Sequence, residues 1–78
     1  MEAYNVWRPV TPSDTTDLPD GLTNALWIGS GGDVAAVMQN GQVQVFAAVP
    51  AGAWMPLTVK RINASGTTAT GIIALYFV

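Results

Sequence analysis

From position 24 onward, short apolar runs of the chain alternate with clusters of glycine, proline and small polar residues. None of these runs repeats at the three-to-four-residue spacing of a helix. They follow one another at roughly ten-residue spacing, which is typical of a small sandwich or barrel. The predicted strands are 25–28, 34–38, 42–49, 55–63 and 68–78. The pattern predicts an all-β fold, a small antiparallel β-sandwich or barrel of about five strands.

Turn signals separate the predicted strands. The strongest is Asn40-Gly41, because a type I′ hairpin turn needs positive φ at both of its central positions. The glycine-rich stretch 29–32 superficially resembles a phosphate-binding loop, but no helix follows it and no Gly-Lys-Ser/Thr sequence is present. We interpret this stretch as a glycine turn.

Alternation along the strands predicts which faces are buried. Two strands each have one apolar face, formed by Val43, Val45, Ala47 and Val49 in one strand and by Met55, Leu57 and Val59 in the next. The last strand is apolar on both faces, with Ile73, Leu75 and Phe77 on one side and Ile72, Ala74, Tyr76 and Val78 on the other. Such a strand must be covered on both sides, and we expect the second cover to come from the N-terminal segment or another subunit.

The first 23 residues form a different kind of segment. Pro9, Pro12 and Pro19 favour extended backbone at and before their own positions. Trp7 and Val10 give the segment apolar surface to bury against the domain or a neighbour. We therefore divide the chain into an extended N-terminal arm, residues 1–23, and a β domain, residues 24–78.

Composition indicates that the chain works in an assembly. It has 78 residues, of which 10% are charged and 50% apolar, and it contains no cysteine and no histidine. A soluble domain has about 25% charged residues. A domain this small usually needs a disulfide, a metal or a neighbouring subunit for stability. Because the chain has neither cysteine for a disulfide nor histidine, the commonest metal ligand, oligomerisation is the remaining source of stability. Large apolar patches usually mark interfaces.

The same composition argues against several functions. Arg8, Lys60 and Arg61 are the only cations, too few for the basic surface that binding to nucleic acid requires. No apolar run reaches the roughly 18 residues of a membrane span. The first residues also lack the basic region and apolar stretch of a signal peptide. We expect neither nucleic acid nor membrane as a partner.

The residue types also argue against catalysis. Without histidine and cysteine, the usual bases and nucleophiles are missing; a serine–lysine pairing remains possible, but no triad can be assembled. Asp14, Asp17 and Asp20 could supply oxygen ligands to Ca²⁺, but their spacing does not match a calcium-binding loop. Aspartates of this kind more often form turns and caps. We expect no enzyme, no cofactor and no metal site.

The three tryptophans have two interpretations. Exposed rings can stack on sugars, but tryptophans in a small domain more often serve as core residues or interface anchors. Trp27 lies in an apolar strand, and we expect it in the core. Trp7 and Trp54 lie next to prolines or turns and are the interface candidates.

Several segments resemble one family of proteins. They are the stretches 10–14 and 17–19, together with "ALWIGSGGDVAAV", "VPAGAWMPLTVKRI" and "ASGTTATGIIALY". In these segments, which span Val10 to Tyr76, the chain is similar to small virion proteins of tailed phages, in particular spike-base proteins of phage capsids and gene transfer agents. The resemblance implies a β-sandwich-like subunit on the outside of the head, either at a vertex as the base of a fibre or between capsomers as a cement. It implies no catalytic residues.

Composition and resemblance together predict a virion structural protein, a capsid decoration (cement) or head spike-base subunit. The expected partners are further copies in a trimer or pentamer and the major capsid protein or other virion subunits, on the outer surface of a phage head assembled in the host cytoplasm. The arm and the last strand are expected to carry the interface through Trp7, Val10, Trp54, Ile72 and Tyr76. A tail or baseplate component and a glycan-binding fibre module are the alternatives.

Overall fold

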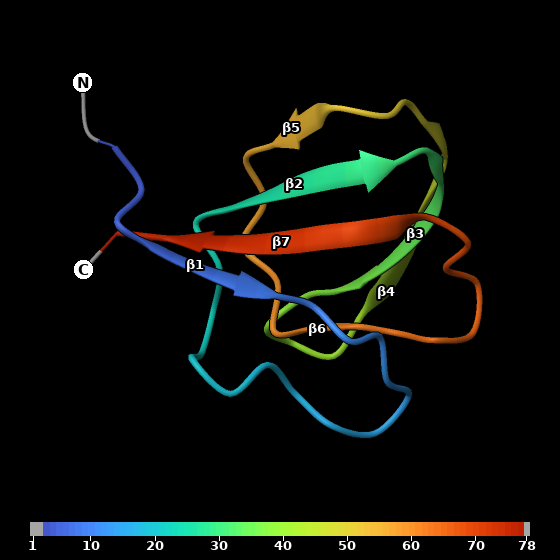
Figure 1. Cartoon of the computed structure of the whole chain (residues 1–78). Helices are drawn as coiled ribbons and strands as arrows, with labels where there is room; N and C mark the ends of the chain where they lie inside the picture. Colours follow the sequence, from blue (N-terminus) through green and yellow to red (C-terminus); the bar gives the residue numbers. More distant parts are fainter. Residues whose placement is uncertain (1–2, 78) are drawn as a thin grey trace.

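Two antiparallel sheets pack face to face in the computed structural model, which describes residues 3–77 (Figure 1). The larger sheet has the strand order β1-β7-β2-β5, with β1 at Val6–Pro9, β2 at Ala25–Ser30, β5 at Ala53–Met55 and β7 at Thr70–Tyr76. The smaller sheet has the order β4-β3-β6, with β3 at Gly32–Val37, β4 at Val43–Val49 and β6 at Arg61–Ile62. No helix occurs among the described residues. The predicted all-β fold is confirmed.

The N-terminal arm docks on its own domain. Its strand β1 pairs with β7, so that β7 lies between β1 and β2 in the middle of the larger sheet (Figure 1). Beyond β1, the arm follows the segment that contains β6: the Ser13 N–H donates to the Ile62 carbonyl at 2.9 Å, and the Leu18 N–H donates to the Lys60 carbonyl at 2.8 Å. The arm therefore extends one sheet and hydrogen-bonds to the edge of the other.

The core lies between the two sheets. Its largest fully buried apolar side chains come from both layers and are Leu26, Ile28, Val34 and Ile62. One polar side chain is buried with them: the Thr23 hydroxyl donates to the Leu57 carbonyl at 2.7 Å and accepts from the Val59 N–H at 3.1 Å. These two hydrogen bonds offset the cost of removing the hydroxyl from water.

The hairpin between β3 and β4 forms as predicted, but its turn type differs. The Gly41 N–H donates to the Met38 carbonyl at 2.9 Å, and the Met38 N–H donates to the Gln42 carbonyl at 2.8 Å. Gly41 has φ of 91°, whereas Asn40 is not among the residues with positive φ. The turn is therefore a type I turn followed by a left-handed glycine, and the type I′ prediction is wrong.

The face predicted to be buried in β4 is also partly wrong. Val43 and Val45 are 44% and 45% exposed, while Phe46 packs against the core. The cause is a β-bulge: Val34 pairs with Phe46 but Gly32 pairs with Val49, so β4 has one extra residue here. The extra residue reverses the alternation, and only Val49 of the predicted face points inward.

The predicted strand 55–63 is two short strands in different sheets. Met55 ends β5 in the larger sheet, and the chain crosses to the smaller sheet before β6 begins at Arg61. Pro56, which has no N–H to donate, follows β5 directly. The predicted inward face is nevertheless correct, because Val59 is buried and Met55 and Leu57 pack against the core.

Candidate interface: the tryptophan face

The outward face of the larger sheet gathers the three tryptophans. Cross-strand partners lie on the same face of a sheet, and Trp27 is the partner of both Trp54 and Ile73, while Trp7 is the partner of Leu75. We call these five side chains the tryptophan face. The exposed fractions of the three tryptophans are 67% for Trp7, 41% for Trp27 and 55% for Trp54.

A shallow hollow of about 310 Å³ opens in the tryptophan face. It is lined by Trp7, Trp27, Ile73 and Leu75, all of them apolar. The indole N–H of Trp7 donates to the Tyr4 carbonyl at 2.8 Å, which leaves the carbon surface of the ring available. The tryptophan face can therefore bury apolar surface against a partner, but its own side chains offer almost no hydrogen bonds.

Two further aromatic rings extend this surface at one end. Tyr4 stacks on Phe77, with ring centroids 4.5 Å apart and planes inclined by 23°. Tyr4 also meets Trp54 in a tilted contact with centroids 6.4 Å apart. Phe77 is 44% exposed. Aromatic surface thus continues from the sheet onto the start of the arm and the end of β7.

The five residues predicted for the interface lie on both sides of the larger sheet. Trp7 and Trp54 belong to the tryptophan face, and Val10 is half-buried against the core. Ile72 and Tyr76 point into the core and are only 3% and 4% exposed. Burial also raises the pKa of the Tyr76 phenol, whose hydroxyl donates to the Gly21 carbonyl at 3.4 Å.

Trp27 lies on the outward face of the larger sheet. It was expected in the core, and that prediction is wrong, because its neighbours Leu26 and Ile28 are fully buried and alternation turns Trp27 outward. The alternation in the sequence did group the apolar residues that β7 and its end contribute to this surface. Ile73, Leu75 and Phe77 were grouped on one face of the last strand, and the structure places them outward.

The three aspartates of the arm have separate partners. The Asp14 carboxylate accepts from the N–H and the hydroxyl of Ser65, at 2.9 and 2.7 Å. Asp17 pairs with Arg61 at 2.8 Å, and Asp20 pairs with Arg8 at 2.7 Å. Within residues 3–77, no group of three or more histidine, cysteine, aspartate or glutamate side chains is arranged to hold a metal. Asp14 and Asp17 attach the arm to the β domain, whereas Asp20 pairs with Arg8 within the arm.

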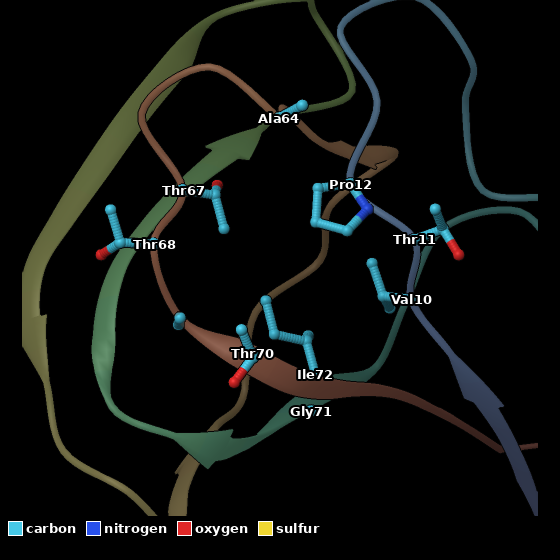
Figure 2. A pocket seen from close by; sticks show the side chains of 10 residues that line it. Val10, Thr11, Pro12, Ala64, Thr67, Thr68, Thr70, Gly71 and Ile72 are labelled. Atoms are coloured by element: carbon cyan, nitrogen blue, oxygen red, sulfur yellow. The ribbon is translucent and has the colours of Figure 1, made fainter.

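A second cavity, of about 500 Å³, lies where the arm passes the segment before β7 (Figure 2). Val10, Pro12 and Ile72 line it together with several threonines. Two of these threonine hydroxyls accept backbone hydrogen bonds, Thr67 from Ala35 and Thr68 from Asp33. The lining contains no titratable side chain, so this cavity offers no acid, base or charged ligand.

The described residues contain no helix long and apolar enough to cross a membrane.

Comparison with known proteins identifies a structural relative of the chain. No family model matches the chain, and no curated protein matches it. Among solved structures, the chain is similar to a chain in the capsid of a native gene transfer agent (GTA) particle computed with C5 symmetry, with a TM-score of 0.85 and 30% sequence identity. The match covers 94% of this chain and 83% of the GTA chain. The chain therefore belongs to the same family as this component of the GTA capsid, and it is a phage-like virion structural protein.

Proposed function

We propose that the chain is a capsid decoration (cement) or head spike-base subunit that attaches to the outer surface of the head and stabilises it. The observation that carries this proposal is the tryptophan face on a chain whose structural relative lies in a capsid. A subunit that binds only the assembled shell stabilises that shell by mass action. Neither the tryptophan face nor the threonine-lined cavity contains a group suited to acid–base catalysis, which supports a non-enzymatic role.

The size of the apolar surface supports burial in an assembly. An aromatic side chain buries about 150–250 Å². From the exposed fractions of Trp7, Trp27, Trp54 and Phe77, the free subunit leaves on the order of 400 Å² of aromatic surface in water. This area is within the range of the largest apolar patch on a monomer, which is often functional, and it is about half of one side of a standard protein interface.

We further propose that the partners are other copies of the chain, in a trimer or pentamer, together with the major capsid protein. The relative comes from a capsid computed with C5 symmetry, which supports the pentamer and a location at a vertex. A trimer would suit a cement between capsomers. In either ring, the contacts between copies use two different surface patches of each subunit.

Two alternatives use the same surface. A tail or baseplate component would bury the tryptophan face against a different virion subunit. A glycan-binding fibre module would keep it exposed, since sugars stack on aromatic rings. The hollow between Trp7 and Trp27 has an entirely apolar lining, whereas a sugar site also needs hydrogen-bonding groups, so the attachment role is better supported.

The test is the composition of purified particles from the producing strain. We expect the chain to co-purify with the particles and gold-labelled antibody to mark the outside of the head in electron micrographs. The double variant Trp7→Ser/Trp54→Ser should fold but be depleted from particles at least tenfold, because a buried aromatic anchor contributes about 2 kcal/mol or more. The exposed turn variant Gln39→Ser is the matched control and should be retained. Label on the tail, or full retention of the double variant, would contradict the proposal.

A further inference from the structure

The four edge strands of the two sheets differ in how they are protected. Strand β1 is short and ends at Pro9, with an Arg8–Asp20 ion pair beside it. Strand β5 has three residues and is followed by Pro56. The arm hydrogen-bonds along β6 through the Ile62 carbonyl. Shortness, proline, charge, bulges and a covering segment are the usual means of blocking an edge. Strand β4 has seven residues and no charge, and its bulge and the proline that follows it, Pro50, lie at its far end and leave the edge at Val43 and Val45 open.

The backbone of β4 is open at two residues. Phe46 and Gln44 lie opposite Val34 and Ala36, in the register of the hydrogen-bonded Met38–Gln42 pair. In an antiparallel ladder hydrogen-bonded and non-hydrogen-bonded pairs alternate, so Val43 and Val45 direct their N–H and C=O groups away from β3. The Gln44 carboxamide makes only a long contact, 3.5 Å, with the Val45 carbonyl. Two outward donors and two outward acceptors are thus available to another strand.

Strand β4 is itself uncharged, and the Asp33 carboxylate that contacts it lies at its far end, on Ala48. No charged residue occurs between Asp33 and Lys60, so β4 carries no charge that would repel an added strand. The side chains of Val43 and Val45 are nearly half exposed on the outer face. An uncharged, β-branched, open edge of this kind is suited to pairing with another polypeptide.

A cavity lies beside the same strand on its inner side. It has a volume of about 240 Å³ and room for one large apolar side chain. We call it the β4 pocket, and it is lined by Ala36, Met38, Gln44, Phe46, Leu57, Thr58 and Val59. Where a peptide adds to a sheet edge, main-chain hydrogen bonds supply affinity and pockets for alternate side chains supply specificity. The open edge and the β4 pocket together provide both.

We propose that β4 binds an extended, uncharged segment of another virion subunit as an added strand, with one large apolar side chain of that segment in the β4 pocket. A second copy of this chain is a poorer occupant. The other three edges of a second copy are blocked, so it could pair only through its own β4. In such a β4–β4 pair, the inward side chains Gln44 and Phe46 of each copy line that copy's own pocket, so neither copy would fill the pocket of the other. The inference rests on the proposed function only for the source of the segment.

The experiment uses the isolated chain and a synthetic probe. The probe is a capped seven-residue peptide of alternating threonine and valine with leucine at its centre. In ¹⁵N-edited NMR spectra we expect its addition to shift the amide signals of Val43 and Val45 and to slow their hydrogen exchange, together with changes at Leu57 and Val59 in the pocket. A peptide with aspartate in place of the leucine should bind at least tenfold more weakly, because a carboxylate loses most of its hydration in a pocket lined mainly by apolar side chains.

Two matched protein variants separate the contribution of the Val45 N–H to binding from the contribution of its side chain. Val45→Pro and Val45→Ala both shorten the side chain, but only the proline removes the outward N–H. Because that N–H makes no bond within the sheet, the fold should survive. We expect V45P to bind the peptide about tenfold more weakly than V45A. Methylating alternate amide nitrogens of the peptide should have the same effect, and this test does not alter the protein.

Three outcomes would overturn the inference: no binding of the leucine peptide at millimolar concentration, equal binding of the aspartate peptide, or concentration-dependent dimerisation of the chain through β4. Each leaves the particle experiment unaffected. Conversely, a chain that binds the peptide but is absent from heads would overturn the proposed function and leave the β4 site in place.

Discussion

At the scale of single residues, Ala48 has the most unusual backbone. Its φ is 55°, and it alone among the described non-glycine residues has positive φ. A left-handed conformation costs about 1–2 kcal/mol for a residue with a side chain. The conformation is held in place because the Ala48 N–H donates to the Asp33 carboxylate at 2.9 Å. This contact fixes the bulge that turns Val43 and Val45 outward.

Removal of the Asp33 carboxylate should therefore destabilise the fold. We expect Asp33→Ala to lower the free energy of unfolding by about 1–2 kcal/mol, since the bulge loses the acceptor for its N–H. Asp33→Asn is the matched control, because its amide oxygen can still accept the bond, and it should lose less than half as much. Urea denaturation followed by tryptophan fluorescence measures both. Equal losses for the two variants would show that charge, rather than this hydrogen bond, is what matters.

At the scale of elements, the arm shows how a polar segment can be fixed without a core of its own. Asp14 contacts Ser65 and Asp17 contacts Arg61 of the β domain, while Asp20 pairs with Arg8 of the arm itself. Exposed ion pairs each contribute little, about 1 kcal/mol or less. Hydrogen bonds from the Ser65 N–H and hydroxyl hold the pKa of the Asp14 carboxyl below its usual value.

We predict that acidification loosens the arm. The Asp14 carboxyl has a lower pKa in the folded chain than in the unfolded chain, so its contribution is complete above about pH 4 and is lost as the pH falls through the folded value. The melting temperatures of the wild type and of Asp14→Asn, measured between pH 2 and 7, should differ most near neutrality and converge in acid. Parallel curves over the whole range would contradict this role for Asp14.

The elements also show what the sequence can and cannot predict. The alternation of apolar and polar residues predicted the positions of most strands well, because most strands bury one face. It failed at β4, where the extra residue near Ala48 shifts the period, and bulges of this kind leave no composition signal. It also joined β5 to β6, since the alternation of Met55, Leu57 and Val59 continues while the chain crosses between the sheets.

The exposure of the tryptophans was predicted in part. Trp7 and Trp54 were identified because they stand next to turns or prolines, and the structure leaves both exposed. Trp27 was misplaced because an apolar strand does not reveal which face points to the core until its partners are known. Pairing of Trp27 with both Trp54 and Ile73 settles its direction.

At the scale of the whole molecule, the sandwich is thin. Its extents are 32 × 26 × 17 Å, and sheets that pack face to face are about 10 Å apart, so there is one layer of core side chains. Most of the aromatic side chains lie outside that layer: Trp7, Trp27, Trp54 and Phe77 are all more than 40% exposed. Much of the apolar area that could contribute to stability is thus left exposed in the isolated subunit.

We therefore predict that the purified chain self-associates. Sedimentation velocity at low micromolar concentration should give a discrete trimer or pentamer, and Trp7→Ser/Trp54→Ser should shift the population toward monomer. Loss of association should precede loss of folding, so the circular dichroism of the double variant should match that of the wild type. A monodisperse wild-type monomer would contradict this prediction and would mean that the subunit assembles only on the particle.

The position of β7 has a consequence for when assembly can start. It is the last of the seven strands in residues 3–77, yet it lies at the centre of the larger sheet. During translation its two neighbours emerge from the ribosome first and have no common partner until β7 is released. Contacts between distant parts of the chain also form slowly during folding. The tryptophan face, to which β7 supplies Ile73 and Leu75, is therefore completed only after β7 has been synthesised and has paired, so in the proposed role a subunit that lacks β7 would not attach to a particle.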